Sequence, residues 1–341
     1  MKVRLSDIAK RLNISSTAVS LAINNKPGVS ENTRRKVIDM CNNIGYKLPN
    51  MAEYPDRNEN IKLCIYKKHG LVVSNTPFFS AVLEGIGLEA EKKNINVMYT
   101  YLSEKVNSRE EICDILQHVD AGGMIVLATE MDEEDVKLME NCNVPLVILD
   151  AYFEHMKIDS VLIDNIEATK EIVEYLISCQ HTKIGYLKSR IRINNFKERE
   201  AGLLQTLQKH GIKYEKKFEF EVGSTPETAY ADFFELLNKE SELPTAFFAD
   251  NDIIALGAMR ALKEFNLNVP EDISIVGFDG LPNSGLVSPS LTTVRVRGKD
   301  MGRFAVERLV GKIENDLFAY VTTRLGTDIV LGQSVSKPKT K

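Results

Sequence analysis

The sequence predicts an all-α head of about 48 residues, followed by an α/β core of two lobes with parallel sheets. Two observations lead to this prediction. Residues 1–48 hold three short segments with apolar residues at helical spacing, and from residue 61 onward strand-like apolar runs alternate with amphipathic helical runs. Such alternation is typical of parallel sheets covered by helices. A chain of 341 residues is long enough for more than one domain.

The charge of the chain is unevenly divided between these parts. The formal net charge is −5, but residues 1–50 hold nine Lys and Arg against three Asp and Glu, a balance of +6. The remaining residues therefore carry −11. A basic module on an acidic body is typical of a small nucleic-acid-binding domain joined to a domain with another task.

The head is predicted to contain three helices. Apolar residues at i, i+3, i+4 and i+7 predict the first helix over Leu5–Leu12. Ser15 is a good N-cap for the second helix and Ser30 for the third, because a serine hydroxyl can accept a free first-turn N–H. Four residues are expected on the outer face of the second helix, the small polar Ser16, Thr17 and Ser20 together with Leu21.

Two helices joined by a tight turn, the second with small polar side chains outside, predict a helix-turn-helix. Its second helix can enter a DNA major groove about 12 Å wide and approach the base edges. Arg34 in the third helix is expected to add a phosphate contact. The alternative is a small helical cap without a ligand, which the positive charge of the head disfavours.

Other classes of function find little support in the sequence. The sequence contains no run of 18 apolar residues, so no membrane span is predicted. The N-terminus lacks an apolar signal region, so we expect a cytoplasmic protein. The five cysteines form no CxxC pair and are expected to be reduced. No catalytic constellation, metal-ligand spacing or phosphate-binding loop is recognisable, so we expect no enzymatic activity, no metal and no cofactor.

The stretch "LSDIAKRLNISSTAVSLAINNKPGVSENTRRKVIDMCNNIGYKLPN" resembles the DNA-binding head of LacI-type transcription regulators, the family of lac repressor and galactose repressor. The core resembles the periplasmic-binding-protein-like core of that family, above all from Pro244 to Gly280. The resemblance implies a helix-turn-helix domain over 1–48, a hinge over 49–60 and an effector-binding and dimerisation core over 61–335. Within the core, lobe 1 is expected at about 61–160 and 292–321, and lobe 2 at about 161–291 and 322–335.

The resemblance also implies which residues contact double-stranded operator DNA. They are expected in the head and the hinge, at Ser15, Ser16, Thr17, Ser20, Leu21, Asn24, Arg34, Met51 and Tyr54. Many members of the family have Arg where this chain has Leu21. Leucine cannot make the bidentate contact of Arg to guanine but can pack on a thymine methyl group, so the operator is expected to differ at that position.

The hinge departs from the family pattern, in which a short helix wedges a Leu into the minor groove. That Leu is missing, and Pro55 disfavours a helical conformation at Tyr54. Three interpretations stay open. The hinge couples weakly, or Met51 or Tyr54 replaces the wedge, or the segment only tethers the head.

Polar residues follow the predicted core strands, where ligands bind in open parallel sheets. The resemblance places effector contacts at Lys68, Phe79, Asp150, Arg199, Asn251 and Asp279. Carboxylates, amides and guanidinium groups suit a sugar-like ligand. Lys67, Lys68 and His69, together with Arg199, raise a phosphorylated sugar as a candidate, and the alternative is that the lysines are simply solvated. Thr225 stands where some members of the family have a stacking aromatic residue, and Val296 where others have a polar or aromatic group.

Together these features predict a dimeric repressor whose operator affinity is controlled by a small ligand between the lobes. Family dimers pair through lobe 1, which implies an interface at Phe78–Leu88 and Asp114–Val119 and suits a palindromic operator. An activator or a corepressor-dependent regulator stays open, because the sign of the coupling depends on the state that the ligand prefers. A solute-binding protein and an α/β enzyme with a regulatory head are the more distant alternatives.

Overall fold

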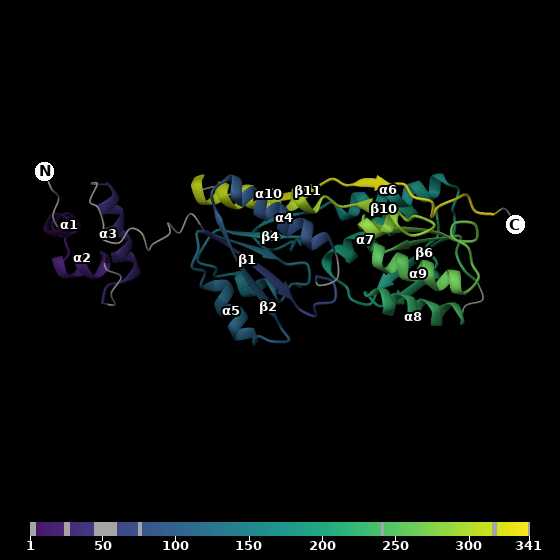
Figure 1. Cartoon of the computed structure of the whole chain (residues 1–341), viewed down its shortest axis with the longest axis horizontal. Helices are drawn as coiled ribbons and strands as arrows, with labels where there is room; N and C mark the ends of the chain where they lie inside the picture. The colour runs from purple at the N-terminus through teal and green to yellow at the C-terminus, as the bar shows by residue number, and fades with distance from the viewer. Residues whose placement is uncertain are drawn as a thin grey trace. The chain divides into compact units, whose positions relative to one another are not determined.

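The computed structural model describes residues 5–23, 28–43, 60–73, 77–239, 242–315 and 319–339. The chain divides into two compact units, Met1–Arg57 and Asn58–Lys341 (Figure 1). The predicted hinge contacts Met51 and Tyr54, and Asn24 of the head, lie outside the described residues.

The first unit contains the three predicted helices, α1 (Leu5–Leu12), α2 (Ser16–Ile23) and α3 (Glu31–Asn43). The Oγ atom of Ser15 accepts the N–H of Ala18 at 3.0 Å, and the Oγ atom of Ser30 accepts the N–H of Thr33 at 3.2 Å. The predicted N-caps are therefore confirmed. Apolar side chains of all three helices form a small core of Ile8, Ala9, Val19, Ala22, Ile23, Val37 and Cys41.

The second unit contains two sheets of six strands. The lobe 1 sheet has the order β11 (Thr322–Leu325), β5 (Asp159–Ile163), β4 (Leu146–Leu149), β3 (Gly123–Leu127), β1 (Asn60–Lys67), β2 (Asn96–Ser103), and all its strands are parallel. The lobe 2 sheet has the order β12 (Asp328–Val330), β10 (Thr292–Arg295), β9 (Ser274–Asp279), β8 (Ala246–Ala249), β6 (Ile184–Ser189), β7 (Glu219–Val222). Only the pairing of β12 with β10 is antiparallel in it.

Helices cover both faces of each sheet, as continuous apolar strands require. Lobe 1 carries α4 (Pro77–Lys92), α5 (Arg109–Gln117), the 3₁₀ helix η2 (Val136–Met139) and α10 (Gly298–Asn315). Lobe 2 carries α6 (Asn165–Ser178), α7 (Asn194–Lys209), η3 (Lys216–Phe218), α8 (Pro226–Leu237), α9 (Asp252–Glu264) and η4 (Pro282–Gly285). Figure 1 shows the two groups of helices around their respective sheets. No helix in the described part of the chain is long and apolar enough to cross a membrane.

The lobe boundaries differ from the prediction near the C-terminus. Strand β10 belongs to the lobe 2 sheet, although residues 292–321 were expected in lobe 1, and β11 belongs to the lobe 1 sheet, although residues 322–335 were expected in lobe 2. The chain therefore crosses between the lobes after β5, after β10 and after β11. Strands of four residues are too short to show a periodicity that would place them in either sheet.

One predicted helix is also shorter than expected. The sequence favours a helix over Asp132–Asn141, but only the 3₁₀ turn Val136–Met139 forms. The Oδ1 atom of Asp132 accepts the N–H groups of Glu134 and Asp135, which gives this backbone a turn in place of a first helical turn.

Helices α4 and α10 pack closely because glycines stand at their contact. A Cβ atom on Gly85 would overlap the carbonyl oxygen of Lys299, and one on Gly302 would overlap that of Val82. The sequence "GIG" at Gly85–Gly87 carries no nucleotide-binding signature, and the structure assigns Gly85 a packing role. Gly87, two residues further on, faces open space, because a Cβ atom there would meet nothing within 4 Å.

This difference predicts opposite effects of two alanine substitutions on one helix. Gly85→Ala is expected to lower the free energy of unfolding by about 1–3 kcal/mol through overpacking. Gly87→Ala is expected to raise it by up to about 1 kcal/mol, since alanine is the better helix former. Urea denaturation of both variants measures the difference, and equal midpoints would contradict the assigned packing role.

Candidate functional site

A cavity lies between the two lobes, at the carboxyl ends of their strands. Its lining comes from both lobes and consists of Val72, Phe78, Phe79, Thr129, Asp150, Ile163, Ile193, Asn195, Phe196, Arg199, Asn251, Asp279 and Val296. The cavity measures about 20 Å³, which is about the space of one water molecule. A sugar-sized ligand therefore requires the lobes to move apart or the lining side chains to rearrange.

Asp150 follows β4 and brings a carboxylate from lobe 1 into the cavity. Its φ of 64° turns the backbone out of the strand, in the left-handed region that Asp tolerates better than most residues. The carboxylate accepts the hydroxyl of Thr129 at 2.6 Å and the Nδ2 group of Asn195 at 3.0 Å. Because Asn195 belongs to lobe 2, the second bond joins the lobes across the cavity.

Arg199 on α7 is the buried cation of the site. Its Nε group donates to Oδ1 of Asn165 at 3.0 Å, Nη1 donates to the backbone oxygen of Asp250 at 2.5 Å, and Nη2 lies 3.2 Å from Oδ1 of Asp279. The guanidinium plane also lies over the ring of Phe278, 3.7 Å from its centroid. With contacts in three directions, this side chain forms one wall of the cavity in the structure.

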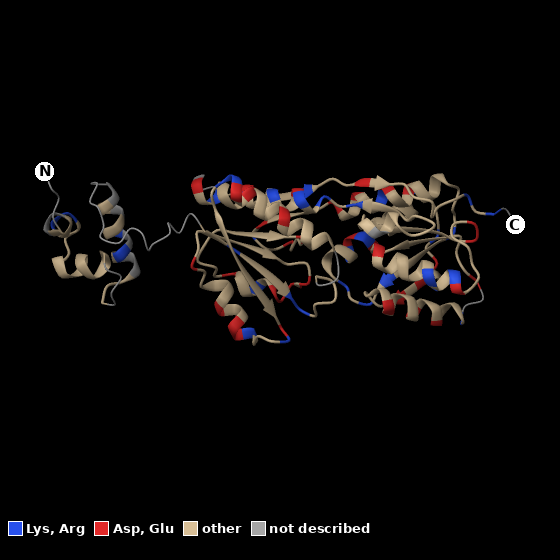
Figure 2. Cartoon of the chain, viewed as in Figure 1, with Lys and Arg blue, Asp and Glu red and all other residues tan. Residues whose placement is uncertain are grey.

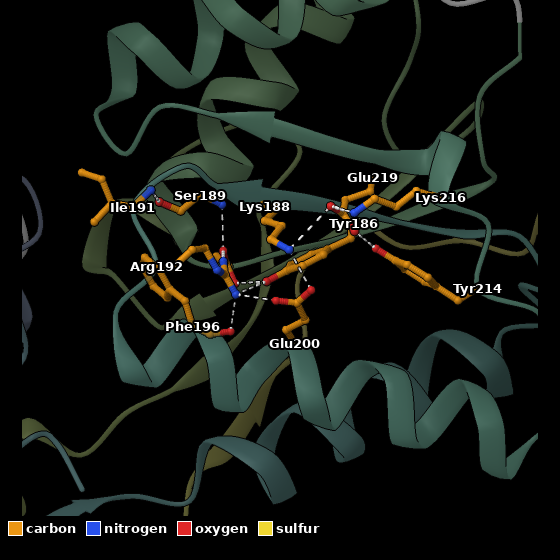
Figure 3. A network of polar contacts seen from close by, with 11 residues as sticks. Tyr186, Lys188, Ser189, Ile191, Arg192, Phe196, Glu200, Tyr214, Lys216 and Glu219 are labelled. Atoms are coloured by element: carbon orange, nitrogen blue, oxygen red, sulfur yellow. Dashed lines mark hydrogen bonds and ion pairs between the residues drawn. The ribbon is translucent and has the colours of Figure 1, made fainter. Parts of the chain in front are cut away.

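A polar network around Arg192 holds the start of α7, the helix that carries Asn195 and Arg199. Figure 3 shows Arg192 in this network with Tyr186 and Glu200. The carboxylate of Asp250 accepts the hydroxyl of Tyr186 at 2.5 Å, the N–H of Ser189 at 2.8 Å and Nη1 of Arg192 at 2.6 Å. Nη2 of Arg192 donates to the carbonyl oxygen of Phe196 at 2.8 Å and to Glu200 at 2.9 Å. Strand β6, the following loop and the first turns of α7 are thus fixed to one another.

The carboxyl groups of the site are hard to ionise because they are buried. Burial raises the pKa of Asp150 and of Asp279 to about 6, although Arg199 favours their charged forms. Burial also raises the pKa of Asp250, and that of Asp252 to about 7. Of these carboxyl groups, Asp279 pairs with Arg199 and Asp250 with Arg192, and the cavity itself is rich in hydrogen-bond acceptors.

Asn251 and Asp252 connect the cavity to the start of α9. Oδ1 of Asn251 accepts the N–H of Ile254 at 3.0 Å and caps the helix, so its NH₂ group is the part of the amide left for the cavity. The carboxyl group of Asp252 accepts the N–H of Leu281 at 2.8 Å, the hydroxyl of Ser284 at 2.8 Å and that of Thr293 at 2.5 Å. Asp252 therefore ties the ends of β9 and β10 to α9.

Five of the six predicted effector contacts line this cavity. They are Phe79, Asp150, Arg199, Asn251 and Asp279, and Val296 lies beside them. Thr225 does not line it, because its hydroxyl caps α8 through the N–H of Thr228. Sequence reasoning missed Thr129 and Asn195. Thr129 follows a buried strand and could have been found by that signal, whereas nothing in the sequence marks Asn195.

The sixth predicted contact, Lys68, lies elsewhere. Its Nζ atom is 2.5 Å from Oδ2 of Asp132 and 2.9 Å from Oδ2 of the fully buried Asp135. A buried carboxylate needs a cationic partner, and Lys68 supplies it. His69 pairs with Glu130 and Lys67 lies over the ring of Tyr101, so this basic cluster brings no positive charge to the cavity.

Glu130 is a third buried residue that sequence reasoning missed. Its Oε2 atom accepts the N–H groups of His69 and Gly70 at 3.1 and 2.7 Å, and Oε1 accepts those of Val72 and Val73 at 2.9 and 3.0 Å. Burial alone would raise the pKa of Glu130, but the His69 side chain and these backbone bonds together outweigh burial and lower the pKa to about 2. The carboxylate thereby shapes the loop that carries Val72 to the cavity.

In the head, Ser16 and Thr17 are exposed on α2, as expected of residues that reach a groove, and Ser20 and Leu21 are half-buried. Nη1 of Arg34 donates to the carbonyl oxygens of Leu21 and Ala22, at 3.3 and 3.2 Å. Arg34 therefore satisfies the C-terminal end of α2 and fixes α2 against α3.

Basic side chains of the head stand on the helices on either side of α2. Lys10 and Arg11 lie in the last turn of α1, and Arg34 and Lys36 lie on α3. Figure 2 shows Lys and Arg of the head in blue. Positive charge of this kind attracts a phosphate backbone without reading its sequence. Within the described ranges, no group of His, Cys, Asp and Glu side chains is placed to hold a metal ion.

Comparison with known proteins gives the same two-part division. Residues 4–50 match the family described as "Bacterial regulatory proteins, lacI family", and residues 173–335 match the "Periplasmic binding protein-like domain". The chain is 26% identical to the HTH-type transcriptional repressor PurR of Mannheimia succiniciproducens over 336 residues, which cover 98% of each chain.

Solved structures share the fold over nearly the whole chain. A complex of the transcriptional regulator CelR with cellobiose has a TM-score of 0.73 at 23% identity and covers 97% of this chain and 99% of its own. A lac repressor dimer bound to operator and the anti-inducer ONPF has a TM-score of 0.72 at 24% identity, with 98% and 100% covered.

The cradle around Glu130 generates a stability prediction. Glu130→Gln puts an NH₂ group against backbone donors and is expected to lower the free energy of unfolding at pH 7 by about 1–3 kcal/mol. A carboxylate with a lowered pKa stabilises above its ordinary pKa of 4.5 and loses this effect as the pH falls through about 2, so pH 7 shows the full loss. Urea denaturation measures it, with hydrogen exchange at Val72 and Val73 as the local readout.

A matched control for this substitution is Glu134→Gln. Glu134 pairs only with Lys137 at the surface, and such exposed pairs contribute at most about 1 kcal/mol. Equal stability of the two variants would show that the cradle adds nothing.

Proposed function

Because this chain belongs to the lacI family of bacterial regulatory proteins, we propose that it is an operator-binding repressor controlled by a small ligand in the interlobe cavity. It is a sequence-specific DNA-binding transcription regulator and not an enzyme or a transport solute receptor. The observation that carries the proposal is a cavity lined from both lobes, since a ligand bound there acts on the lobe arrangement.

DNA recognition is assigned to the exposed face of α2. Ser16 and Thr17 are short and polar and can reach base edges, and Leu21 offers an apolar contact to a thymine methyl group. Arg34 supports this face from α3, and phosphate contact through it is a further part of the proposal. Contacts by Ser15, Ser20, Asn24, Met51 and Tyr54 stay predictions of the family resemblance. Since its target is bacterial operator DNA, the protein is proposed to act in the cytoplasm.

The operator-binding form is proposed to be a homodimer, the state of the lac repressor in its operator complex. Two heads related by a twofold axis suit a palindromic operator. The proposed interface includes Phe78–Leu88 and Asp114–Val119. Leu88 supports it, because this large apolar side chain on α4 is 49% exposed in the single chain.

The effector is proposed to be a neutral ligand rich in hydroxyl groups, such as a sugar. CelR, which shares the fold, is solved with cellobiose. Asp150 and Asp279 accept hydrogen bonds from hydroxyl groups, whereas an anion would meet two carboxyl groups and a guanidinium group that is already engaged. The location of Lys68 outside the cavity argues further against a sugar phosphate.

Operator selection tests the DNA-binding part of the proposal. Full-length protein presented with random duplex DNA is expected to select a palindrome, and Leu21→Arg is expected to shift one symmetric position toward guanine, since Arg binds O6 and N7 of guanine. Leu204→Arg is the matched control, because Leu204 lies 38% exposed on α7 of the core. No enrichment, or the same shift with the control, would refute the assigned reading face.

Calorimetry tests the effector part with cellobiose, ribose and glucose 6-phosphate as probes. A neutral sugar is expected to bind, and Asp279→Asn to weaken binding about tenfold or more through loss of a charged hydrogen bond. Ligand hydroxyls favour the ionised carboxylates, whose pKa is about 6 in the free protein. Binding at pH 6 is therefore expected to release protons, with affinity rising from pH 5 to pH 7. Binding of glucose 6-phosphate alone, or proton uptake, would refute the proposed ligand class.

A further inference from the structure

Asn165 begins α6 and is fully buried, yet it does not line the cavity. Its Oδ1 atom accepts the Nε group of Arg199 at 3.0 Å. Its Nδ2 group donates to Oδ1 of Asn195 at 3.2 Å and to Oε2 of Glu198 at 2.9 Å. Both N–H bonds of the amide are thus used, in two different directions.

The partners of Asn165 lead to both lobes. Arg199 and Asn195 line the cavity, and Asn195 donates to Asp150 of lobe 1. Glu198 lies outside the cavity lining, and its second oxygen, Oε1, is 3.0 Å from Nη2 of Arg324 on β11 of lobe 1. The guanidinium group of Arg324 also lies 5.5 Å from the ring centroid of Tyr152, another lobe 1 residue.

We propose that Asn165 is a positioning residue that couples the ligand cavity to the interlobe ion pair of Glu198 and Arg324. This proposal rests on the proposed function, in which lobe movement carries the ligand signal. Asn165, Glu198 and Arg324 form a continuous chain of polar contacts from Arg199 to the far lobe. Asn165 orients two ligand-facing side chains and the acidic half of the ion pair with a single amide group.

The side-chain amide of Asn165 can satisfy both Arg199 and Glu198 in one orientation only. Turning it by half a rotation would bring its NH₂ group against the Nε group of Arg199 and its oxygen against the carboxylate of Glu198, so both contacts would become repulsive. When Arg199 turns toward a ligand, Oδ1 of Asn165 loses its donor and the restraint on Glu198 weakens. In the other direction, a formed ion pair holds Glu198, and through it the orientation of Asn165 and Arg199.

The partial burial of the ion pair favours a measurable contribution of this pair to lobe closure. The side chains of Arg324 and Glu198 are 30% and 19% exposed, so the pair is less screened than one at the open surface. Glu174 offers a comparison, because it pairs with Lys209 between α6 and α7 but within lobe 2. A substitution there changes a similar helix pair without touching an interlobe contact.

Hydrogen exchange of the full-length protein without any ligand tests the proposal. Arg324→Gln and Glu198→Gln remove the ion pair, and Glu198→Gln keeps an oxygen that can accept from Asn165. Both are expected to raise exchange about tenfold at the interlobe segments 150–153 and 194–199, whose protection depends on closure. Glu174→Gln is expected to leave both segments unchanged.

The coupling itself is tested by Asn165→Asp, which keeps the acceptor for Arg199 and replaces the two donors with an acidic group. It is expected to raise exchange at 150–153 in lobe 1, which Asn165 does not touch. Combining it with Arg324→Gln is expected to add nothing beyond the larger single effect, because both act on one pathway. A merely structural role would raise exchange only around α6 and α7.

Two results would overturn the proposal. They are unchanged exchange at 194–199 in Arg324→Gln, and additive effects in the double variant. If Asn165→Asp fails to fold, the Arg324 and Glu198 variants still decide, since unchanged exchange in both rejects the coupling. The experiment uses no ligand, so a calorimetric screen without a hit would count against the proposed effector and leave this result unaffected.

Discussion

The structure of the core is organised around one buried guanidinium group, that of Arg199. Removing such a charge from water costs several kcal/mol unless hydrogen-bonding and ionic partners surround it. The partners come from separate elements, with Asn165 at the start of α6, the backbone of Asp250 after β8, and Asp279 at the end of β9. The cation therefore fixes the mutual positions of these strand ends, and the ligand cavity is the space that remains beside it.

Polar contacts from α7 also connect this cluster to lobe 1. Lobe 1 reaches this cluster through Asp150 and Arg324, each held by a residue of α7. A small number of polar contacts gives a closed arrangement without making it permanent, because each such bond contributes only about 1–3 kcal/mol net. A ligand that exchanges some of these contacts for its own can then shift the population of lobe arrangements, which is what allosteric control requires.

Sequence reasoning predicted the helices of the head, most of the alternating elements of the core and five side chains that line the cavity in the structure. Those predictions succeeded because caps, periodicity and strand ends are local signals, as at Ser15 and at Asp150 after a buried strand. It failed where the answer depends on distant partners. Lys68 is paired with Asp135, 67 residues away, and Glu130 holds a loop about 60 residues distant. The prediction assigned β10 and β11 to the wrong lobes, because strands of four residues show no periodicity that would place them. The position of β11 is set by β5, where Thr322 pairs with the distant Ser160.

The carboxyl groups of the cavity also limit which ligands can bind there. Asp150 and Asp279 line the cavity, and burial raises the pKa of both although Arg199 favours their charged forms. A group that donates hydrogen bonds relieves this cost, whereas an anion adds to it. Ligand hydroxyls would therefore stabilise a ligand-filled cavity by adding donors to those that Thr129, Asn195 and Arg199 supply. The unfavourable burial of acceptors becomes the source of selectivity, because only a donor-rich ligand gains from closing the lobes around them.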